Sequence, residues 1–312
     1  MKLTQNSELL ICISIHYYAY LFSLASIRLG RSSRAVRYEM QVMKSPMIGR
    51  NVIREEEGAC LGSSCRGFGV SVLDSLLPEG VPVPCSLLIA ADVGTGSEFL
   101  AGAMLREHLR RGGGDARVLW LSFENFVDDL RGMLSSLWVA EEEGLLERVR
   151  FVDCYSSQIG VESKEVYNAD PSNLPALGLV TSTAISEVGA DSSSNLLVIL
   201  DSLSLLVQMV GLRASTEFFK TLVGRTRHIK ADLLTTLNRS AFRETTLSTF
   251  AGITDIVIEL TINDDINSTR LRLRKARDTR HIKDWLPYEI DFESRTLTSR
   301  CERIQETMEL TL

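Results

Sequence analysis

The sequence lacks the excess of positive charge and the paired cysteines that mark two large classes of protein. Its net charge is −6 at pH 7, which is not the basic balance expected of a nucleic-acid-binding domain, although a local basic patch is compatible with it. None of its six cysteines belongs to a CxxC pair. Cys60 and Cys65 have no second pair or histidine nearby, so the common zinc-site patterns are excluded. We expect reduced thiols, buried as small apolar side chains.

Internal repeats and low-complexity tracts are also missing. The 312 residues are 45% hydrophobic and 24% charged, which is ordinary for a globular protein. A chain of this length can bury a full core without disulfides, and it has room for one large domain with an appendage or for two small domains. We expect an N-terminal extension at 1–50, a main domain at 51–300 and a tail at 301–312.

The N-terminal extension contains a segment without formal charge, residues 9–27, which four arginines follow. A bilayer core needs about 20 mostly apolar residues, and arginines after such a segment would hold the downstream side in the cytoplasm. The segment is a poor secretory signal, because Lys2 is the only basic residue before it and no clear cleavage site follows. We therefore expect a cytoplasmic main domain, either free or anchored to the membrane through 9–27.

Two other interpretations of this segment remain open. Its serines, histidine and tyrosines weaken a membrane-spanning assignment. Met40, Met43 and Met47 all precede the regular part of the chain, so the true start could lie there and the upstream residues could be an unstructured or mis-assigned extension. The third interpretation is an extra helix that packs on the main domain.

Apolar strands and amphipathic helices alternate between residues 85 and about 240. The strand patterns lie at 85–91, 116–125, 149–156, 195–202 and 231–238. The helical patterns lie at 97–111, 127–146, 173–188 and 215–230. This alternation predicts an α/β fold with a mostly parallel central sheet and helices on both faces. Patterns at 255–262, 269–277 and 286–292 indicate a C-terminal antiparallel hairpin region.

The stretch "LLIAADVGTGSEFLAGAML", residues 87–105, has the pattern of a phosphate-binding loop: a buried strand, a glycine turn and a helix. In the motif GxxxxGK[ST], backbone amides cradle the phosphates, the lysine reaches the outer phosphates and the hydroxyl holds Mg²⁺. Aligned on Gly96, Ala91 stands in place of the motif's first glycine, and Gly94 and Thr95 precede Gly96. Ser97 and Glu98 stand where the lysine and the hydroxyl residue belong, so this degenerate Walker A motif keeps its turn and loses its cation.

The replacement of Lys-Thr by Ser97 and Glu98 makes the loop two charge units less positive. One pair of charges at 4 Å is worth about 4 kcal/mol at an effective dielectric of 20. Even heavily discounted, the change corresponds to a loss of roughly a hundredfold or more in phosphate affinity. Glu98 also has a purely structural interpretation, since acids are favoured in the first turn of a helix.

Other candidate site residues lie at strand ends. Asp201 ends the apolar run "LLVILD", where P-loop proteins place the acid of the magnesium shell; an acid that only stabilises a turn is the alternative. Glu124 ends "VLWLSFE" and could polarise an attacking water. Lys275 and Arg277 are two positions apart on a predicted strand, so they share one face and suit an anion, or else form a solvated basic face.

Taken in order, these motifs resemble the RecA superfamily, specifically archaeal KaiC-like and RadA-like ATPase domains. The resemblance spans about 66–298. It rests on "GVPVPCSLLIAADVGTGSEFLAGAML", "ARVLWLSFEN", "RFVDCYS", "NADPSNLPALGLVTSTAISE", "NLLVILDSLSLL" and "RLRLRKARDTRHIKDWLPYEID". It implies a RecA-like P-loop fold that binds ATP and Mg²⁺ between the subunits of a ring.

The resemblance also implies a role for each matching residue. Glu124 would be the catalytic acid, Asp201 the acid on the magnesium side, and Lys275 with Arg277 the contacts to a neighbouring subunit's phosphates. Asn125 stands in place of one of the family's two glutamates. We expect ATP and Mg²⁺ to bind weakly if at all, and hydrolysis to be vestigial or weak.

Three hypotheses of function follow. The leading one is a KaiC-like regulatory or signalling protein that acts through protein partners or itself, including a mixed ring with an active relative. The second is an active ATPase in which a lysine from elsewhere, such as Lys275 of a neighbour, replaces the missing one. The third is a DNA recombination or repair accessory protein, against which the net charge of −6 counts.

Overall fold

The computed structural model describes residues 65–138, 140–190, 195–263, 268–291 and 296–299. The chain divides into two compact units, 1–57 and 58–312, and all described residues belong to the second. Within this described part, no helix is long and apolar enough to cross a membrane. The segment 9–27 lies outside the described residues, as do the rest of the N-terminal extension and the whole C-terminal tail.

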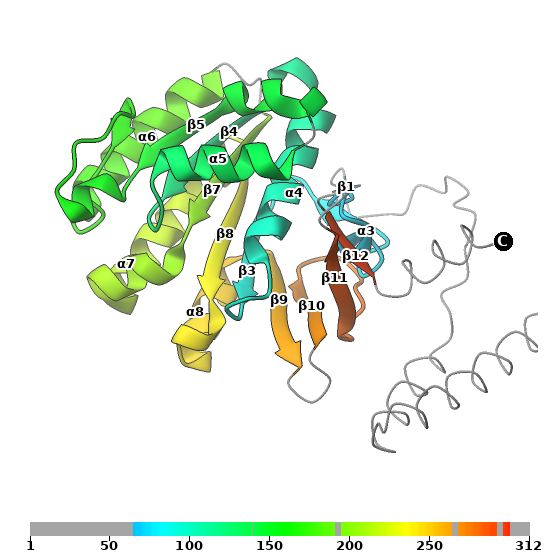
Figure 1. Cartoon of the computed structure of the whole chain (residues 1–312). Coiled ribbons are helices and arrows are strands. Elements are labelled where there is room, and N and C mark those ends of the chain that lie inside the picture. The colour runs from blue at the N-terminus through cyan, green and yellow to red at the C-terminus, as the bar shows by residue number, and fades with distance from the viewer. Residues whose placement is uncertain (1–64, 139, 191–194, 264–267, 292–295, 300–312) are drawn as a thin grey trace, which may run out of the picture. The chain divides into compact units, whose positions relative to one another are not determined.

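A ten-stranded sheet forms the centre of the second unit (Figure 1). From one edge to the other, its strands are β12 (Thr296–Ser299), β11 (Leu286–Asp291), β10 (Ser268–Ala276), β9 (Ile256–Asn263), β3 (Ser86–Ala91), β8 (Asp232–Asn238), β7 (Leu196–Asp201), β4 (Arg117–Ser122), β5 (Val149–Asp153) and β6 (Tyr167–Asn168). From β9 to β6 all neighbours are parallel. The strands β10, β11 and β12 are antiparallel to their neighbours.

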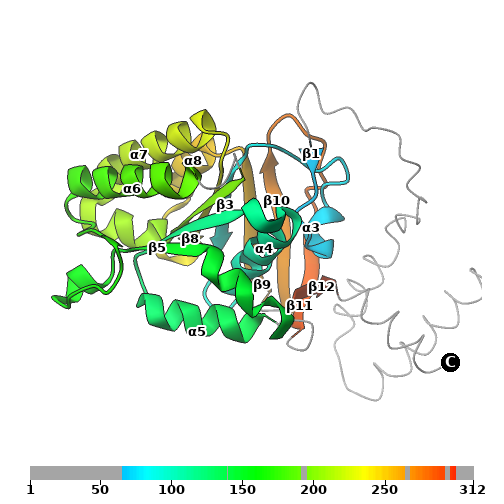
Figure 2. The same cartoon turned by 90° about the horizontal axis from the view of Figure 1, so that it is seen from above.

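Helices cover both faces of the sheet (Figure 2). One face carries α3 (Ser71–Asp74), α4 (Ser97–Arg111) and α5 (Val127–Leu137), and the other carries α6 (Leu174–Ala190), α7 (Leu203–His228) and α8 (Glu244–Ile253). Successive residues of a strand point to opposite faces. Accordingly Leu87 and Ile89 belong to the core beneath α4, and Leu88 belongs to the core beneath α7. The continuous apolar runs thus reflect burial on both faces, and the predicted α/β, RecA-like architecture is confirmed.

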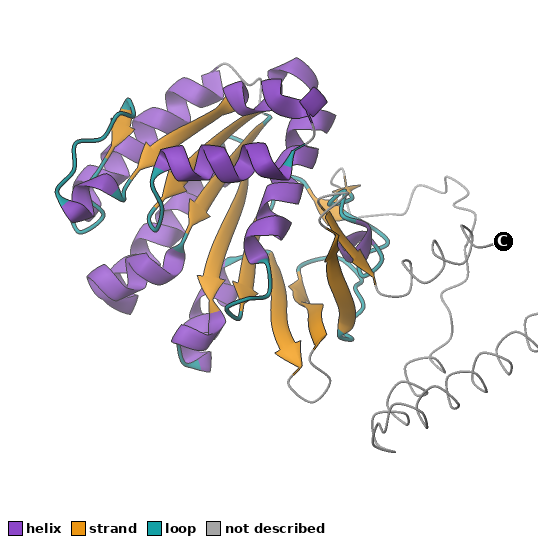
Figure 3. Cartoon of the chain, in the orientation of Figure 1, coloured by secondary structure: helices purple, strands orange, loops and turns teal. Residues whose placement is uncertain are grey.

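Short elements complete the described unit (Figure 3). A separate two-stranded sheet pairs β1 (Cys65–Arg66) with β2 (Val81–Pro82). The 3₁₀ helices are η1 (Gly113–Asp115), η2 (Ala140–Arg148), η3 (Ser156–Ile159) and η4 (Arg239–Ala241). The two-stranded sheet lies near the amino ends of the central strands, because the Arg66 guanidinium at the end of β1 pairs with Asp232 at the start of β8.

Two predicted helices differ from the observed ones. The helix predicted at 127–146 is wrong beyond Leu137, because Trp138 adopts an extended backbone (φ −107°, ψ 149°) and buries its indole in the core. The helix predicted at 215–230 begins earlier, at Leu203, and kinks at Gly211, whose φ of 80° is easy only for glycine. Helix α8 has no counterpart among the predicted elements. In each case tertiary packing outweighs the local pattern.

The expectation of reduced cysteines is correct for two of the cysteines described. Cys85 and Cys154 are free and buried, and burial raises the pKa of each thiol well above its ordinary value. Cys65 is disulfide-bonded, so the expectation is wrong there. A disulfide requires only that two sulfur atoms meet in the right geometry, which spacing in the sequence does not reveal.

Candidate functional site

The glycine loop joins β3 to α4 at the carboxyl end of the parallel strands. Gly94 (φ 83°) and Gly96 (φ 74°) both adopt left-handed backbone, and Gly96 caps α4. Side chains whose identity the motif does not specify hold the loop in place. The Asp92 carboxylate accepts hydrogen bonds from the Ser240 and Thr261 hydroxyls, each at 2.6 Å, while the Thr95 hydroxyl donates to the Asp92 carbonyl at 2.7 Å. The glycine turn predicted from the sequence is therefore present.

Strand β11 packs directly against this loop. The Tyr288 hydroxyl donates a hydrogen bond to the Thr95 carbonyl, and burial raises the pKa of Tyr288, so its phenol remains a donor. The Ile290 Cδ1 atom lies 2.4 Å from the position that a Cβ atom on Gly96 would occupy. Gly96 is thus required by its φ angle and by the close approach of Ile290.

The end of the loop is acidic where a phosphate-binding loop is basic. Ser97 and Glu98 form the first turn of α4, and the Ser97 hydroxyl donates to the Glu98 carboxylate at 3.4 Å. The amino end of a helix carries about half a positive charge, which Glu98 complements. A phosphate at this position would be attracted by the helix end and repelled by the Glu98 carboxylate.

Two further acids approach the loop from neighbouring strands. Asp201 ends β7 and accepts a hydrogen bond from the Thr236 hydroxyl at 2.6 Å. Burial, together with the Glu124 and Glu98 carboxylates, raises the pKa of Asp201 to about 6, although the bond from Thr236 opposes this. The Ser202 hydroxyl donates to Glu124. The fold therefore brings two predicted site residues, Glu98 and Glu124, close enough to a third, Asp201, to raise the pKa of its carboxyl.

The carboxylate of Asp201 is expected to destabilise the fold at neutral pH. Its folded pKa of about 6 exceeds the unfolded value of about 3.9. The stability linked to its protonated form is complete below about pH 4 and is lost as the pH rises through about 6. Asp201→Asn keeps the oxygen that Thr236 contacts, so we expect it to raise the free energy of unfolding at pH 7.5 by about 1–2 kcal/mol.

Urea unfolding at pH 4 and pH 7.5 measures this effect. The gain from Asp201→Asn should shrink to about 0.5 kcal/mol at pH 4, where the wild-type carboxyl is protonated in the folded state and about half protonated in the unfolded state. Asp284→Asn, which alters an exposed acid, is the matched control and should change little at either pH. A loss of stability on Asp201→Asn at pH 7.5 would contradict the electrostatic description of the site.

Among the described residues, no group of three His, Cys, Asp or Glu side chains is arranged to hold a metal ion. In P-loop proteins the loop hydroxyl and the nucleotide complete the magnesium shell, and here Glu98 replaces that hydroxyl. Glu98 offers a carboxylate oxygen at that position, and Ser97 offers no cation to a phosphate.

Lys275 and Arg277 lie at the opposite end of the strands from the glycine loop of their own chain. Strand β10 runs antiparallel to β9, and Lys275 pairs with Val257 near the start of β9. The Lys275 ammonium donates to the Ala251 and Thr254 carbonyls at the end of α8, at 2.7 and 2.5 Å. The Arg277 guanidinium pairs with Asp255 at 2.8 Å. The structure does not bring this pair to the other site residues, and a contact with a neighbouring subunit stays a prediction.

Several residues of the site had no role in the prediction from sequence. Ser202 follows Asp201 directly, and Thr236 lies in the neighbouring strand pattern, so strand order would have placed them there. Tyr288 gave no such signal, because 193 positions separate it from Thr95.

Comparison with protein families identifies the chain. Residues 84–260 match the model of DUF7504, a family of unknown function. The chain belongs to the DUF7504 family. The matched span contains the loop, Glu124 and Asp201, and it ends before Lys275 and Arg277. No curated protein matches the sequence.

A solved structure shows the same fold as this DUF7504 protein. It is the KaiC-like protein PH0186 from the hyperthermophilic archaeon Pyrococcus horikoshii OT3, with a TM-score of 0.57 and 18% sequence identity. The similarity covers 76% of this chain and 99% of that chain. The predicted resemblance to a KaiC-like RecA-type domain is thereby confirmed at the level of the fold.

Proposed function

We propose that this DUF7504 protein is a KaiC-like domain that has lost tight ATP binding and acts as a regulatory or signalling protein. It works by contacting protein partners, which include further copies of itself and an active relative in a mixed ring. The fold is that of a KaiC-like protein, and the glycine loop carries Glu98 where a phosphate-binding loop carries a hydroxyl residue. Regulation through contact is the role that this combination supports best.

One observation carries the proposal: the loop keeps its bend while its charge is reversed. Gly94 and Gly96 hold left-handed angles, as a phosphate cradle requires. The charged groups that act most strongly on Asp201 are both acids, Glu124 and Glu98. A triphosphate would add several negative charges beside these carboxylates, and like charges near one another raise the free energy of the complex.

The placement of Lys275 weighs against an active ATPase that borrows a lysine from its neighbour. Its ammonium already donates to two carbonyls at the end of α8. Moving it to another subunit's phosphates would leave both helix-end carbonyls without this donor. Burial and the nearby Arg277 guanidinium also lower the pKa of Lys275, which favours a structural role.

Calorimetric titration of the full chain with ATP and Mg²⁺ tests the proposed loss of binding. We expect no saturable binding at nucleotide concentrations up to about 1 mM, equivalent to a binding free energy weaker than about −4 kcal/mol. Titration with ATP and EDTA serves as the control for binding without metal. A dissociation constant in the micromolar range would overturn the proposal, since binding of that strength requires a favourable phosphate site.

A further inference from the structure

Exposed apolar side chains gather in the segments that follow the carboxyl ends of the parallel strands. Among the described residues, nine large apolar side chains are exposed, and five of them lie in these segments: Val93, Phe126, Ile159, Val161 and Val166. Val161 is 49% exposed and Val166 is 87% exposed. Single exposed apolar residues are ordinary, whereas a concentration of them in one region marks an interaction site.

Two of these residues line a single hollow between α5 and the loop that follows β5. We call it the α5 groove; its volume is about 330 Å³, and its walls include Phe126, Asp129, Val161 and Glu162. A cavity of about 150 Å³ already admits benzene, so the groove has room for an apolar side chain of a partner. It lies where the parallel strands β4 and β5 end.

Ion pairs hold the loop of the groove against the helix. The Arg131 guanidinium donates to both oxygens of Glu165, at 2.7 and 3.0 Å, and the Lys164 ammonium pairs with Asp128 at 2.9 Å. Bidentate pairs of a guanidinium with a carboxylate are the strongest of their kind and fix geometry as well as energy. The fold of the chain itself therefore sets the shape of the groove.

The charge of the groove is negative, because five carboxylates and one ammonium line it. Asp129 and Glu162 are exposed, and neither forms an ion pair or hydrogen bond with another side chain in the described part of the chain. Asp129 lies in the first turn of α5, where the helix dipole favours an acid. Glu162 lies in the loop, where no helix end accounts for it. A partner that fits the groove therefore combines an apolar side chain with a positive charge.

A surface of that kind exists on the same chain, at the end of α7. We call residues 225–230 the α7 end. Ile229 follows the last residue of the helix and is 36% exposed. Exposed cations flank it, Arg225 one turn earlier and Lys230 directly after it. Cations are favoured at the carboxyl end of a helix, but the helix dipole does not account for an exposed isoleucine between them.

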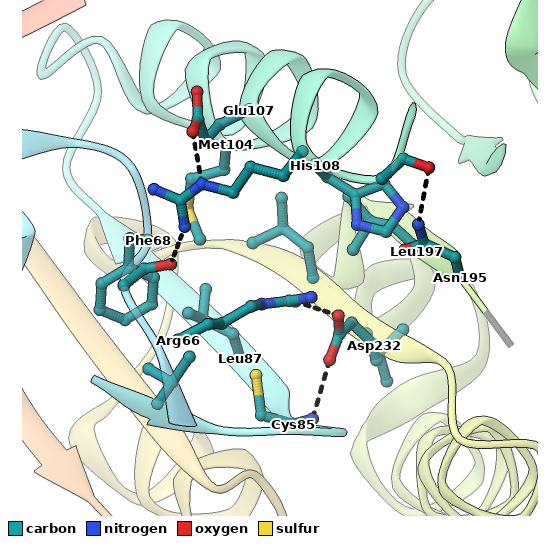
Figure 4. Close-up of a pocket in the computed structure, with 16 residues that line it drawn as sticks. Arg66, Phe68, Cys85, Leu87, Met104, Glu107, His108, Asn195, Leu197 and Asp232 are labelled. Carbon is teal, nitrogen blue, oxygen red and sulfur yellow. Dashed lines mark hydrogen bonds and ion pairs between the residues drawn. The ribbon is translucent and has the colours of Figure 1, made fainter. Parts of the chain in front are cut away.

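The acids beside the α7 end are already paired. Asp232 pairs with the Arg66 guanidinium (Figure 4). Asp255 binds two arginines, one of which is Arg227 of the α7 end itself. The two cations that flank Ile229 therefore have no carboxylate partner among the described residues. The α7 end offers an apolar side chain and unpaired positive charge, which is the complement of the α5 groove.

The α5 groove and the α7 end lie at opposite ends of the central strands. The groove lies where β4 and β5 end, whereas the α7 end directly precedes the start of β8, which is parallel to them. One copy of the chain can therefore offer its α7 end to a second copy and keep its own groove open for a third. Such head-to-tail contacts join unlike surfaces and extend into rings or filaments.

We propose that the α7 end of one copy docks in the α5 groove of a second copy. Ile229 enters the hollow beside Phe126 and Val161, and Lys230 lies against Glu162. The proposal rests on the function proposed above, in which the protein contacts further copies of itself, and it names the two surfaces that meet. Because opposite charges attract across the contact, association is stronger at low ionic strength. The contact contains no nucleotide.

Charge reversal on each surface tests the contact with the full chain. Sedimentation velocity should show that the wild type associates with a dissociation constant below about 100 μM. Glu162→Lys and Lys230→Glu, each alone, should weaken association at least about tenfold, because each places like charges opposite one another. In an equimolar mixture of the two variants, every α7 end again has a groove of opposite charge to meet. The mixture should therefore associate to within about threefold of the wild type.

Glu147→Lys and Arg213→Glu are the matched controls. Glu147 is an exposed acid just before β5, at the other end of that strand from the groove, and Arg213 is an exposed cation in the first half of α7. Neither change should alter association by more than about threefold. If Lys230→Glu does not fold, Arg225→Glu takes its place with the same expected results.

Three results speak against the docking of the α7 end in the α5 groove. They are a wild type that stays monomeric up to about 200 μM, single reversals that act no more strongly than the controls, and a mixture of folded variants that stays monomeric. None of them bears on the proposed loss of ATP binding, which calorimetric titration decides separately. Failure of this contact and failure of the proposed function are therefore distinguishable.

Discussion

Replacing Ser97 by Lys and Glu98 by Thr is expected to raise the affinity for ATP with Mg²⁺ by roughly a hundredfold or more. The double change makes the loop two charge units more positive and restores the two side chains that contact the phosphates and the metal. One charge pair at 4 Å is worth about 4 kcal/mol at an effective dielectric of 20, and about 2.7 kcal/mol suffices for a hundredfold change. Gly94 and Gly96 already adopt the left-handed backbone of the turn.

The restored lysine has a second effect on the site. A cation at position 97 would lie near Asp201, whose pKa is raised to about 6 by burial and by two neighbouring acids. An adjacent positive charge favours the ionised carboxylate, so the pKa of Asp201 should fall in the variant. A carboxylate that is ionised at pH 7 is also the form that holds Mg²⁺ in P-loop proteins.

Calorimetric titration of the variant with ATP and Mg²⁺ measures the gain. Ser97→Met with Glu98→Thr is the matched control, because it supplies an unbranched side chain and the hydroxyl without the cation. We expect that control to gain at most about tenfold, from the removal of the acid alone. Unchanged affinity in the Lys-Thr variant would contradict the electrostatic explanation and would show that the site has diverged beyond residues 97 and 98.

Asp255→Ala is expected to lower the free energy of unfolding by about 3 kcal/mol. The Asp255 carboxylate is 6% exposed and joins the start of β3 to the end of α7. It accepts hydrogen bonds from the Ser86 amide at 3.0 Å and the Ser86 hydroxyl at 2.7 Å, and it pairs with Arg227 at 2.9 Å and with Arg277. Alanine leaves the buried amide of Ser86 without its acceptor, which accounts for much of the loss.

Chemical unfolding of Asp255→Ala, with Arg227→Ala as control, separates these contributions. The Arg227 side chain is half-exposed, so its removal should cost less than about 1 kcal/mol. Burial by itself raises the pKa of Asp255, but the hydrogen bonds from Ser86 and the charge of Arg227 outweigh it and leave the pKa below its usual value. The stabilisation is therefore complete above about pH 4 and is lost as the pH falls through the folded pKa. Equal losses in the two variants would contradict the central role of the carboxylate.

Much of the site could be predicted because its signals are local. The helix predicted at 97–111 coincides with α4, since the glycine turn before it and the glycine run after it act on neighbouring residues. The strand that ends at Asp201 was predicted from a continuous apolar run, and β7 ends at the same residue. The role of Trp138 was missed, because an extended residue inside a helical pattern becomes favourable only when the core receives its indole.

The partners of the loop could not be predicted, because they come from distant parts of the chain. Tyr288 and Ile290 reach Thr95 and Gly96 only after β10 and β11 have been added to the sheet. For Lys275 the sequence left an anion contact and a solvated face as alternatives, and it did not indicate the two carbonyls at the end of α8 to which the ammonium donates. The sequence pattern identified the candidate site residues, but it did not show which side chains they contact in the folded chain.

By itself the sequence determined the alternation of strands and helices, the glycine bend and the replacement of a cation by Glu98. These features depend on burial and backbone conformation over a few neighbouring residues, which the order of amino acids specifies directly. Only the tertiary structure decided that Glu98 and Glu124 lie close to Asp201 and that Tyr288 and Ile290 pack against the glycine loop. Such proximity depends on the order of strands in the sheet, and the free energy of the whole packed core selects that order.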